Sequence, residues 1–357
     1  MHFKITKKIR GIAIIILLLS MTSIIKAQDK HDIAKNGDGV YSILRRNNIQ
    51  PEKYAKIFIE LNKDRLGKNN SLYIGRKYKL PNTDSSTSGA PDPEASASTT
   101  TATTSPKKAS GAIKSYNIFG KYKDIEIVDN ILNGAAFYLV SGHGGPDPGA
   151  IGKYNGNTMC EDEYAYDVTL RLGRELISHG AAVYFITRDR NDGIRDDAIL
   201  HCDKDEYCYP NNTIPRNHVR RLKQRADAVN NIYTKNKSRY SYHRAIMIHV
   251  DSRSTSQNAD VFFYFADGST KGRKLCLNLQ QTFNAKYGEH QPGRGYHGTV
   301  SMRNLYMLRN TSPVASYIEL ANINHQRDQQ RLVLENNRQA LANWLASGII
   351  KDFRNNK

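Results

Sequence analysis

Two histidines and two glutamates in this sequence have the chemistry of a hydrolytic metal site. They are His143, Glu161, His249 and Glu319. Two imidazoles and one carboxylate, with a fourth position left open, form the ligand set of a hydrolytic zinc site. Zinc lowers the pKa of a bound water to about 7 and polarises a carbonyl group. A second carboxylate is then needed to move a proton to the leaving nitrogen, and Glu319 fits that role.

The predicted strands place three of these side chains at one edge of a sheet. The apolar run 135–140 predicts a strand buried on both faces, and His143 follows it in a turn rich in glycine and proline. His249 and Glu319 each close a later apolar run. If these strands are parallel, their carboxyl ends meet at the edge where ligands bind in open α/β sheets.

Glu161 is placed by a helix rather than by a strand. It begins a predicted helix over 161–178, whose apolar residues recur at steps of three and four: Ala165, Val168, Leu172 and Leu176. Glu161 therefore begins the buried stripe, whereas Glu163 lies roughly on the opposite face. A carboxylate at the start of a buried stripe is costly unless it is paired or binds a metal.

Each of these residues also has an ordinary structural interpretation. A histidine at a strand end is more often a hydrogen-bonded structural residue, and a glutamate at a helix start commonly stabilises the helix dipole. The four residues occur together, in order, at predictable structural positions. That combination favours a functional site over four separate structural roles.

Residues from about 135 to 349 resemble the zinc-dependent N-acetylmuramoyl-L-alanine amidases of cell-wall turnover. The resemblance rests on these segments, in order: Ser141–Ala150 (SGHGGPDPGA), Glu161 with Asp167 and Arg171-Leu172, Gly180–Val183 with Thr187-Arg188, Met247–Ser252 (MIHVDS), and Leu305–Asn310 followed by Ser316–Leu320. It implies zinc on His143, Glu161 and His249, with Glu319 as the general acid/base. The chain departs from the family pattern at 251–252, at 321–324 and in residues 154–160, which lengthen the gap before Glu161.

The resemblance implies hydrolysis of the amide between the lactyl group of N-acetylmuramic acid and the L-alanine of the stem peptide in peptidoglycan. Two alternatives stay open: a catalytically silent peptidoglycan-binding protein, and a zinc peptidase that cuts within the stem peptide. Nucleic acid is not expected as a partner, because the sequence has no zinc-finger spacing and no RNA-binding signature.

The fold class predicted for the catalytic domain, residues 116–357, is α/β, with a mostly parallel twisted sheet flanked by helices. Strands are expected at 137–140, 183–187, 245–248, 261–265 and 315–320, and helices at 161–178, 216–233, 271–287 and 327–346. Strands that alternate with helices in this way are typical of such a sheet.

The segment 191–215 interrupts this alternation as an insertion. It contains Cys202 and Cys208, and disulfides are permissible in an exported protein. We interpret the insertion as a surface loop that is closed by a Cys202–Cys208 disulfide. The alternative is a loop that gates the cleft, because it follows the carboxyl end of a strand.

Residues 30–82 predict a separate, small α+β module with the order strand–helix–helix–strand. In its second helix, Tyr54, Ile57, Phe58 and Leu61 form one apolar stripe, and Asn62 ends the helix. The segment resembles the LysM domain in Gly37-Asp38, Tyr41, Ile43, Asn62, Gly75, Leu80 and Pro81. The resemblance implies binding to the N-acetylglucosamine-containing glycan of peptidoglycan.

The segments around this module indicate export. Residues 1–27 have basic residues, a short apolar run and a small residue for cleavage, the pattern of a signal peptide. The run is too short to predict a stable membrane anchor. The composition of residues 83–115 predicts a disordered Ser/Thr/Pro/Ala linker. Loss of the five basic residues in 1–27 changes the formal charge from +18 to +13, which suits an anionic polymer in the periplasm or outside the cell. We expect a monomer.

Overall fold

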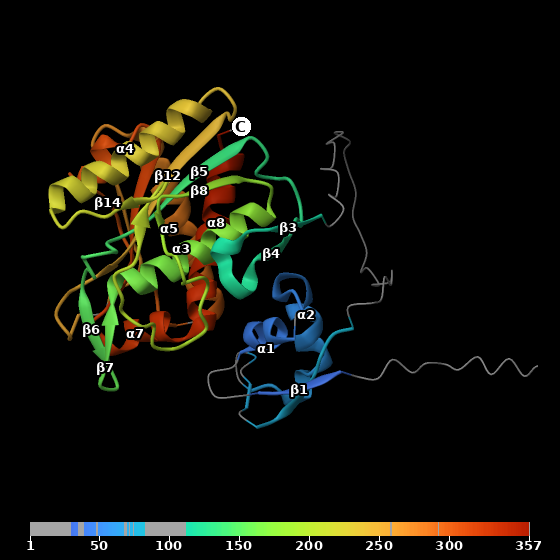
Figure 1. Ribbon diagram of the computed structural model, residues 1–357. Helices are drawn as coiled ribbons and strands as arrows, with labels where there is room; N and C mark the ends of the chain where they lie inside the picture. The colour runs from blue at the N-terminus through green and yellow to red at the C-terminus, as the bar shows by residue number, and fades with distance from the viewer. Residues whose placement is uncertain are drawn as a thin grey trace, which may run out of the picture. The chain divides into compact units, whose positions relative to one another are not determined.

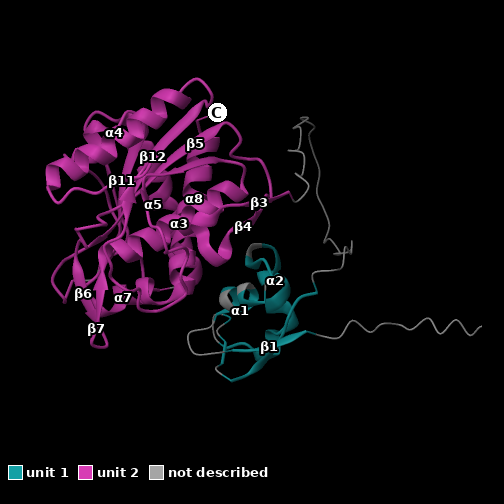
Figure 2. Ribbon diagram, in the orientation of Figure 1, with its two compact units in different colours: residues 1–92 teal, residues 93–357 magenta. Residues whose placement is uncertain are grey.

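The structure is a computed structural model that describes residues 30–34, 39–47, 49–67, 70, 72–73, 75–82, 112–257, 259–291 and 293–356. The chain divides into two compact units, residues 1–92 and 93–357 (Figure 2), and each is described by itself. The predicted signal peptide, most of the predicted linker and the Gly37-Asp38 pair lie outside the described residues.

A six-stranded, mostly parallel sheet forms the centre of the second unit, which confirms the predicted fold class (Figure 1). Its strands, in spatial order, are β14 (Val300–Met302), β13 (Phe262–Phe265), β15 (Val314–Asn322), β12 (Tyr242–Asp251), β5 (Ala135–Ser141) and β8 (Ala182–Phe185). The four strands from β15 to β8 are parallel, and β13 is antiparallel to β15. Every residue of β5 is buried, as its unbroken apolar run predicts.

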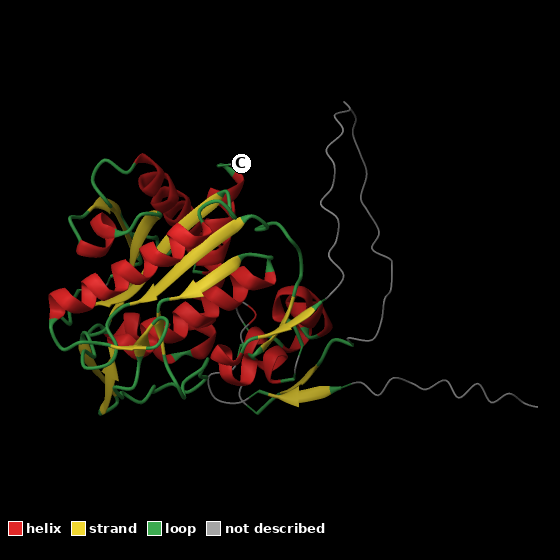
Figure 3. Ribbon diagram, turned by 45° about the horizontal axis from the view of Figure 1, so that its top comes forward, coloured by secondary structure: helices red, strands yellow, loops and turns green. Residues whose placement is uncertain are grey.

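Helices cover both faces of this sheet (Figure 3). One face packs on α3 (Glu161–Ser178), α5 (Thr270–His290) and α8 (Glu335–Arg354), and these elements share the largest apolar core. The other face packs on α4 (His218–Asn236) and α6 (Tyr306–Asn310). The helix expected at 327–346 is two helices, because α7 (Gln326–Val333) ends before Leu334, whose backbone is extended. No helix among the described residues has the length and apolar character needed to cross a membrane.

Short elements that the sequence did not predict surround this core. A hairpin joins β6 (Ile151–Tyr154) to β7 (Asn157–Cys160), and a three-stranded sheet joins β9 (Thr187–Arg188), β10 (Tyr207–Cys208) and β11 (Asn212–Thr213). At the start of the unit, β3 (Ile113–Ser115) pairs with β4 (Asp124–Glu126), and a 3-10 segment (Asn117–Tyr122) lies between them. Strand β3 therefore lies within residues that we assigned to the linker.

The first unit has the predicted strand–helix–helix–strand order. It contains β1 (His31–Ile33), α1 (Val40–Arg46), α2 (Pro51–Leu61), a 3-10 turn (Lys63–Arg65) and β2 (Lys77–Lys79), and β1 pairs antiparallel with β2. Asn62 ends α2, as expected, and its buried amide bonds to the backbone of Phe58 and Lys79. The side chain of Asn62 thus ties the helix to the last strand.

The apolar stripe expected on α2 is wrong in part. Phe58 is fully buried, but Ile57 and Leu61 are 47% and 45% exposed. The face that packs inward instead carries Pro51, Ala55, Phe58 and Asn62, at steps of four, three and four. A buried asparagine takes the place of an apolar residue on this face, because its amide is satisfied by the backbone.

Candidate metal centre

The carboxyl ends of three parallel strands bring the predicted side chains together. His249 on β12 lies in register with Glu319 on β15, and the amide of Gly142 at the end of β5 donates to the carbonyl of Ile248 on β12. His143 follows β5 directly. The convergence expected from parallel strands is therefore present in the structure.

His143, Glu161 and His249 form a compact donor cluster. One nitrogen or carboxylate oxygen of each lies within 4.8 Å of the others. Nδ1 of His249 is 2.9 Å from Oε1 of Glu161, and Nε2 of His143 is 3.3 Å from Oε2. The amides of Ala150 and Val250 also donate to the two oxygens of Glu161, at 2.8 and 3.0 Å. The Glu161 carboxylate is thus held from the strand side and from the loop side.

Two glycines allow the backbone to pack closely around this cluster. A Cβ on Gly149 would stand 2.6 Å from Oε2 of Glu161 and 2.7 Å from the ring of His143, and its φ of +69° disfavours other residues. A Cβ on Gly142 would stand 2.4 Å from the ring of His249. These close approaches explain why glycine occupies positions 142 and 149.

Side chains that the sequence reasoning missed hold the cluster in place. Asp147 bonds Nδ1 of His143 at 2.9 Å, and Arg221 on α4 pairs with Asp147. Arg225, one turn further along α4, donates to the carbonyl oxygen of His143. The ring of Tyr317 stacks on His249 with a centroid distance of 4.2 Å.

A sequence signal for the two arginines does exist. Going backwards along α4, Arg225 and Arg221 continue the buried positions Val229 and Ile232 at helical spacing. This is the same pattern that singled out Glu161 on α3. A charged residue that extends a buried stripe indicates a partner in the interior.

The pKa values in the cluster follow from its contacts. Burial opposes the charge on Glu161, but His143 and His249 outweigh it and hold the pKa of this carboxyl well below its usual range. Burial also opposes the charge on His143, but Asp147 and Glu161 raise its pKa to about 10. Burial lowers the pKa of His249 despite the contact with Glu161. These contacts therefore favour the charged form of His143 and the neutral form of His249.

Glu319 lies beside the cluster and has the opposite shift. Burial, followed by the charges of Glu161 and Asp251, raises the pKa of Glu319 well above its usual value. Its Oε2 atom is buried and has no hydrogen-bond partner among the described residues. A carboxyl whose pKa is raised in this way is better suited to accept and release a proton than an ordinary one.

The three clustered side chains fit zinc by the chemistry of their donors. Two imidazole nitrogens and a carboxylate oxygen are ligands that zinc prefers. Because Asp147 holds Nδ1 of His143, the other ring nitrogen is directed towards Glu161. A carboxylate behind a histidine in this way fixes the ring and its tautomer at metal sites.

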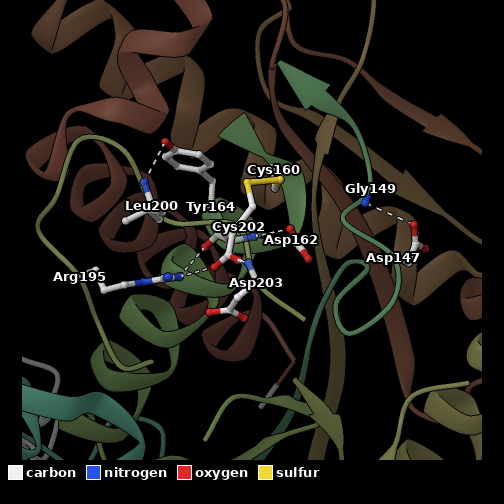
Figure 4. The surroundings of a disulfide bond; sticks show 10 residues. Asp147, Gly149, Cys160, Asp162, Tyr164, Arg195, Leu200, Cys202 and Asp203 are labelled. Carbon is white, nitrogen blue, oxygen red and sulfur yellow. Dashed lines mark hydrogen bonds and ion pairs between the residues drawn. A yellow bond between two sulfur atoms is a disulfide. The ribbon is translucent and has the colours of Figure 1, made fainter. Parts of the chain in front are cut away.

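The predicted Cys202–Cys208 disulfide is wrong. Cys202 pairs with Cys160 at the end of β7, with 5.7 Å between the Cα atoms (Figure 4). Cys208 is a free thiol buried in the core between the sheet and α4, because β10 pairs with β9 and turns this side chain inward. Proximity in sequence therefore selected the wrong partner for Cys202.

The insertion is packed more deeply than the surface loop that we predicted. Leu200 is 1% exposed, and Arg195 pairs with Glu163 at 2.9 Å. Glu163, which we placed on the face opposite to Glu161, is therefore also buried, at 1% exposed. The helix α3 is enclosed on both faces at its start, by the sheet edge and by the insertion.

Comparison with known proteins identifies the larger unit. Residues 138–351 match the family model described as N-acetylmuramoyl-L-alanine amidase. Similar solved structures include the CwlD amidase from Clostridioides difficile in complex with the GerS lipoprotein, at 18% identity and a TM-score of 0.44 over 61% of this chain and 98% of that chain. The catalytic domain of CwlV from Bacillus (Paenibacillus) polymyxa and AmiC2 of Nostoc punctiforme are each 19% identical, with TM-scores of 0.42, over 61% of this chain and 97% of theirs. No curated protein matches the chain.

Proposed function

The chain belongs to the N-acetylmuramoyl-L-alanine amidase family, and from this premise we propose that it hydrolyses the amide between the lactyl group of N-acetylmuramic acid and L-alanine in peptidoglycan. The observation that carries the proposal is the cluster of His143, Glu161 and His249 beside Glu319 at one sheet edge. Together they provide the ligands and the proton carrier that amide hydrolysis requires.

In this proposal His143, Glu161 and His249 hold zinc. When bound, zinc supplies a Lewis acid that polarises the scissile carbonyl and makes water a better nucleophile. Asp147 fixes the ring of His143, and Tyr317 stacks on the ring of His249, so both imidazoles are held before any ligand arrives. Preorganised ligands reduce the reorganisation that binding and catalysis require.

Glu319 moves the proton. It takes a proton from the attacking water and delivers it to the departing amide nitrogen, so that the amine leaves as a neutral group. Its raised pKa supports this role, because a carboxyl must hold the proton between the two transfers. Its Oε2 atom, which has no hydrogen-bond partner in the described part of the chain, can make such a contact.

We also propose that the first unit binds glycan and that residues 1–27 direct export. The strand–helix–helix–strand order of β1, α1, α2 and β2 supports the resemblance to LysM. A binding module on the same chain raises the local concentration of the catalytic unit on the same polymer. Deletion of residues 30–82 should weaken pelleting with purified sacculi while a small soluble muropeptide is cleaved at an unchanged rate.

Digestion of purified sacculi tests the proposed bond. The products are identified by mass spectrometry for the wild type, for Glu319→Gln, for the exposed control Glu289→Gln and after treatment with a chelator. A free L-alanine amino terminus with a free lactyl carboxylate, lost in Glu319→Gln and with the chelator but kept in Glu289→Gln, is expected. New ends within the stem peptide would make the chain a zinc peptidase. Tight binding without cleavage would favour a silent binder.

A further inference from the structure

A second group of carboxylates lies on the other side of the start of α3. Asp162, Glu163 and Glu206 are 2%, 1% and 6% exposed, and one oxygen of each lies within 4.8 Å of the others. Glu206 also belongs to an adjoining group with Asp189 and two aspartates of the insertion, Asp203 and Asp205, which meets the same distance limit. None of these residues belongs to the donor cluster of the amidase.

The negative charge of this group is poorly balanced. Within the described ranges, Arg195 is the only basic side chain in an ion pair with any of these six carboxylates, and it contacts Glu163 alone among them. Arg195 also pairs with Asp192, so its single charge is shared. Buried carboxylates without counter-charges are costly and favour a cation or a proton.

Asp162 provides a second, independent indication of a ligand. Its Oδ1 accepts from the amide of Glu163, but its Oδ2 is buried and has no hydrogen-bond partner in the described part of the chain. A buried polar atom without a partner is rare and calls for an unseen partner. The neighbouring carboxyl groups cannot satisfy Oδ2 when they are ionised, because they are then acceptors only.

We propose that Asp162, Glu163 and Glu206 bind one divalent cation of the calcium type. The available donors are all carboxylate oxygens, which hard cations prefer. Calcium tolerates irregular geometry and takes six to eight oxygens, and the adjoining aspartates and water can complete that number. The chemistry differs from that of the amidase cluster, where two imidazoles suit zinc.

The electrostatics of Glu206 agree with a cation here. Burial, followed by the charges of Glu163 and Asp189, raises the pKa of Glu206 to about 7. A divalent cation would remove this penalty by stabilising the ionised carboxylates. Protonation of these carboxylates is the alternative to a bound cation. Calcium binding distinguishes the two, because a protonated group would not bind calcium.

The bound cation would join three segments. Asp162 and Glu163 belong to the first turn of α3, directly after Glu161. Glu206 comes from the insertion, and its Oε2 accepts from the amide of Gly145 at 2.6 Å, two residues after His143. The amide of Asp203 donates to Oε1 of Glu163 at 2.9 Å. The cation thus fixes the insertion against the helix and the glycine turn, whatever bond the enzyme cleaves.

Calcium titration of the full, zinc-loaded protein tests this proposal. Isothermal calorimetry with CaCl₂ at pH 7.5 should give one site per chain, and calcium at about 100 times its Kd should raise Tm by about 5 °C. Asp162→Asn and Glu206→Gln should each weaken calcium binding by at least about tenfold. Asp124→Asn, which changes an exposed carboxylate, should bind calcium as the wild type does. His249→Ala should also keep the calcium site.

Several results would overturn the proposal. Absence of both heat and a Tm shift in the wild type would mean that protons balance the group. Unchanged affinity in both Asp162→Asn and Glu206→Gln would place calcium elsewhere. Loss of the calcium site in His249→Ala would place it in the amidase cluster. If Glu206→Gln does not fold, Asp162→Asn and the wild type still decide the outcome.

Discussion

Two neighbouring carboxylates in the first turn of α3, Glu161 and Asp162, have pKa values that are shifted in opposite directions. Glu161 and Asp162 are 4% and 2% exposed, so burial disfavours the charge on both. Two imidazoles nevertheless hold the pKa of Glu161 well below its usual range. Burial, followed by the charges of Glu206 and Glu163, raises the pKa of Asp162 to about 8. The partners, rather than the depth of burial, decide whether a buried carboxylate is ionised.

The same helix contains a third buried carboxylate, Asp167, about one and a half turns later. Asp167 is fully buried between the guanidinium groups of Arg171 and Arg338, each 2.7 Å from its Oδ2. Burial would raise the pKa of Asp167, but the two arginines outweigh it and lower the pKa. Along α3, Glu161 therefore lies against two imidazoles and Asp167 against two guanidinium groups, whereas Asp162 has no ion pair with a basic side chain among the described residues.

The largest expected effect is the loss of zinc and activity, and it distinguishes the His143–Glu161–His249 cluster from the neighbouring carboxylate group. His249→Ala removes one of the proposed zinc ligands, so zinc content should fall and activity on sacculi should drop by at least about 1,000-fold. Asp162→Asn lies one residue from Glu161 but outside the cluster, so it should keep one zinc per chain. Elemental analysis with a rate assay measures both. Equal loss of zinc in the two variants would show that the two sites are not separate.

The paired carboxylate should control acid stability. Asp167→Asn leaves two buried arginines without a full counter-charge and should cost about 4 kcal/mol of unfolding free energy at pH 7. Because the folded pKa of Asp167 is lowered, its stabilisation is present above the unfolded value of about 3.9 and is lost as the pH falls below that value. Denaturant unfolding from pH 7 to pH 3 measures this.

A matched aspartate sharpens this test. Asp196 contacts Arg171 at 3.3 Å, but its side chain is 32% exposed. Asp196→Asn should therefore cost about 1 kcal/mol or less. A stability curve for Asp167→Asn that keeps the acid dependence of the wild type would assign that dependence to another group.

The sequence alone was enough to predict five of the six strands of the sheet and the side chains at its edge, but it did not predict the short edge strand β14. The unbroken apolar run of β5 and the residues that close β12 and β15 predicted where His143, His249 and Glu319 would meet. The start of α3 was predicted at Glu161 because local helical spacing is recorded in the chain. These features depend on local periodicity, which a single sequence contains.

The parts that sequence reasoning missed depend on contacts between distant segments. Cys160 and Cys202 are 42 residues apart, and their pairing follows from how the insertion lies over the β6–β7 hairpin. Glu163 is buried by that same insertion, so helical periodicity assigned it to the wrong environment. No local pattern records which segment will cover a helix face.

Loss of the Cys160–Cys202 disulfide should lower the free energy of unfolding by an intermediate amount. Replacement of both cysteines by serine should lower the unfolding free energy by about 3 kcal/mol, because the bridge closes a loop of 42 residues in the unfolded chain. Cys276→Ser, at a buried free thiol, is the control that changes a cysteine without opening a loop. The double variant should also bind calcium more weakly, because the insertion is then held less firmly. Unchanged calcium affinity would mean that carboxylates alone position the insertion.

The smallest expected effect is on zinc affinity, and it tests how Asp147 orients the ring of His143. Asp147→Asn keeps the size of the side chain that bonds Nδ1 of His143 but removes its charge, and it also weakens the pair with Arg221. Carboxylates that orient a ligating histidine contribute about 10- to 100-fold to metal affinity, so zinc affinity should fall within that range. Competition with a chromogenic chelator measures it, with Asp227→Asn on the exposed side of α4 as the control. Full zinc affinity in Asp147→Asn would mean that Arg225 and the glycine turn orient His143 without help from the carboxylate.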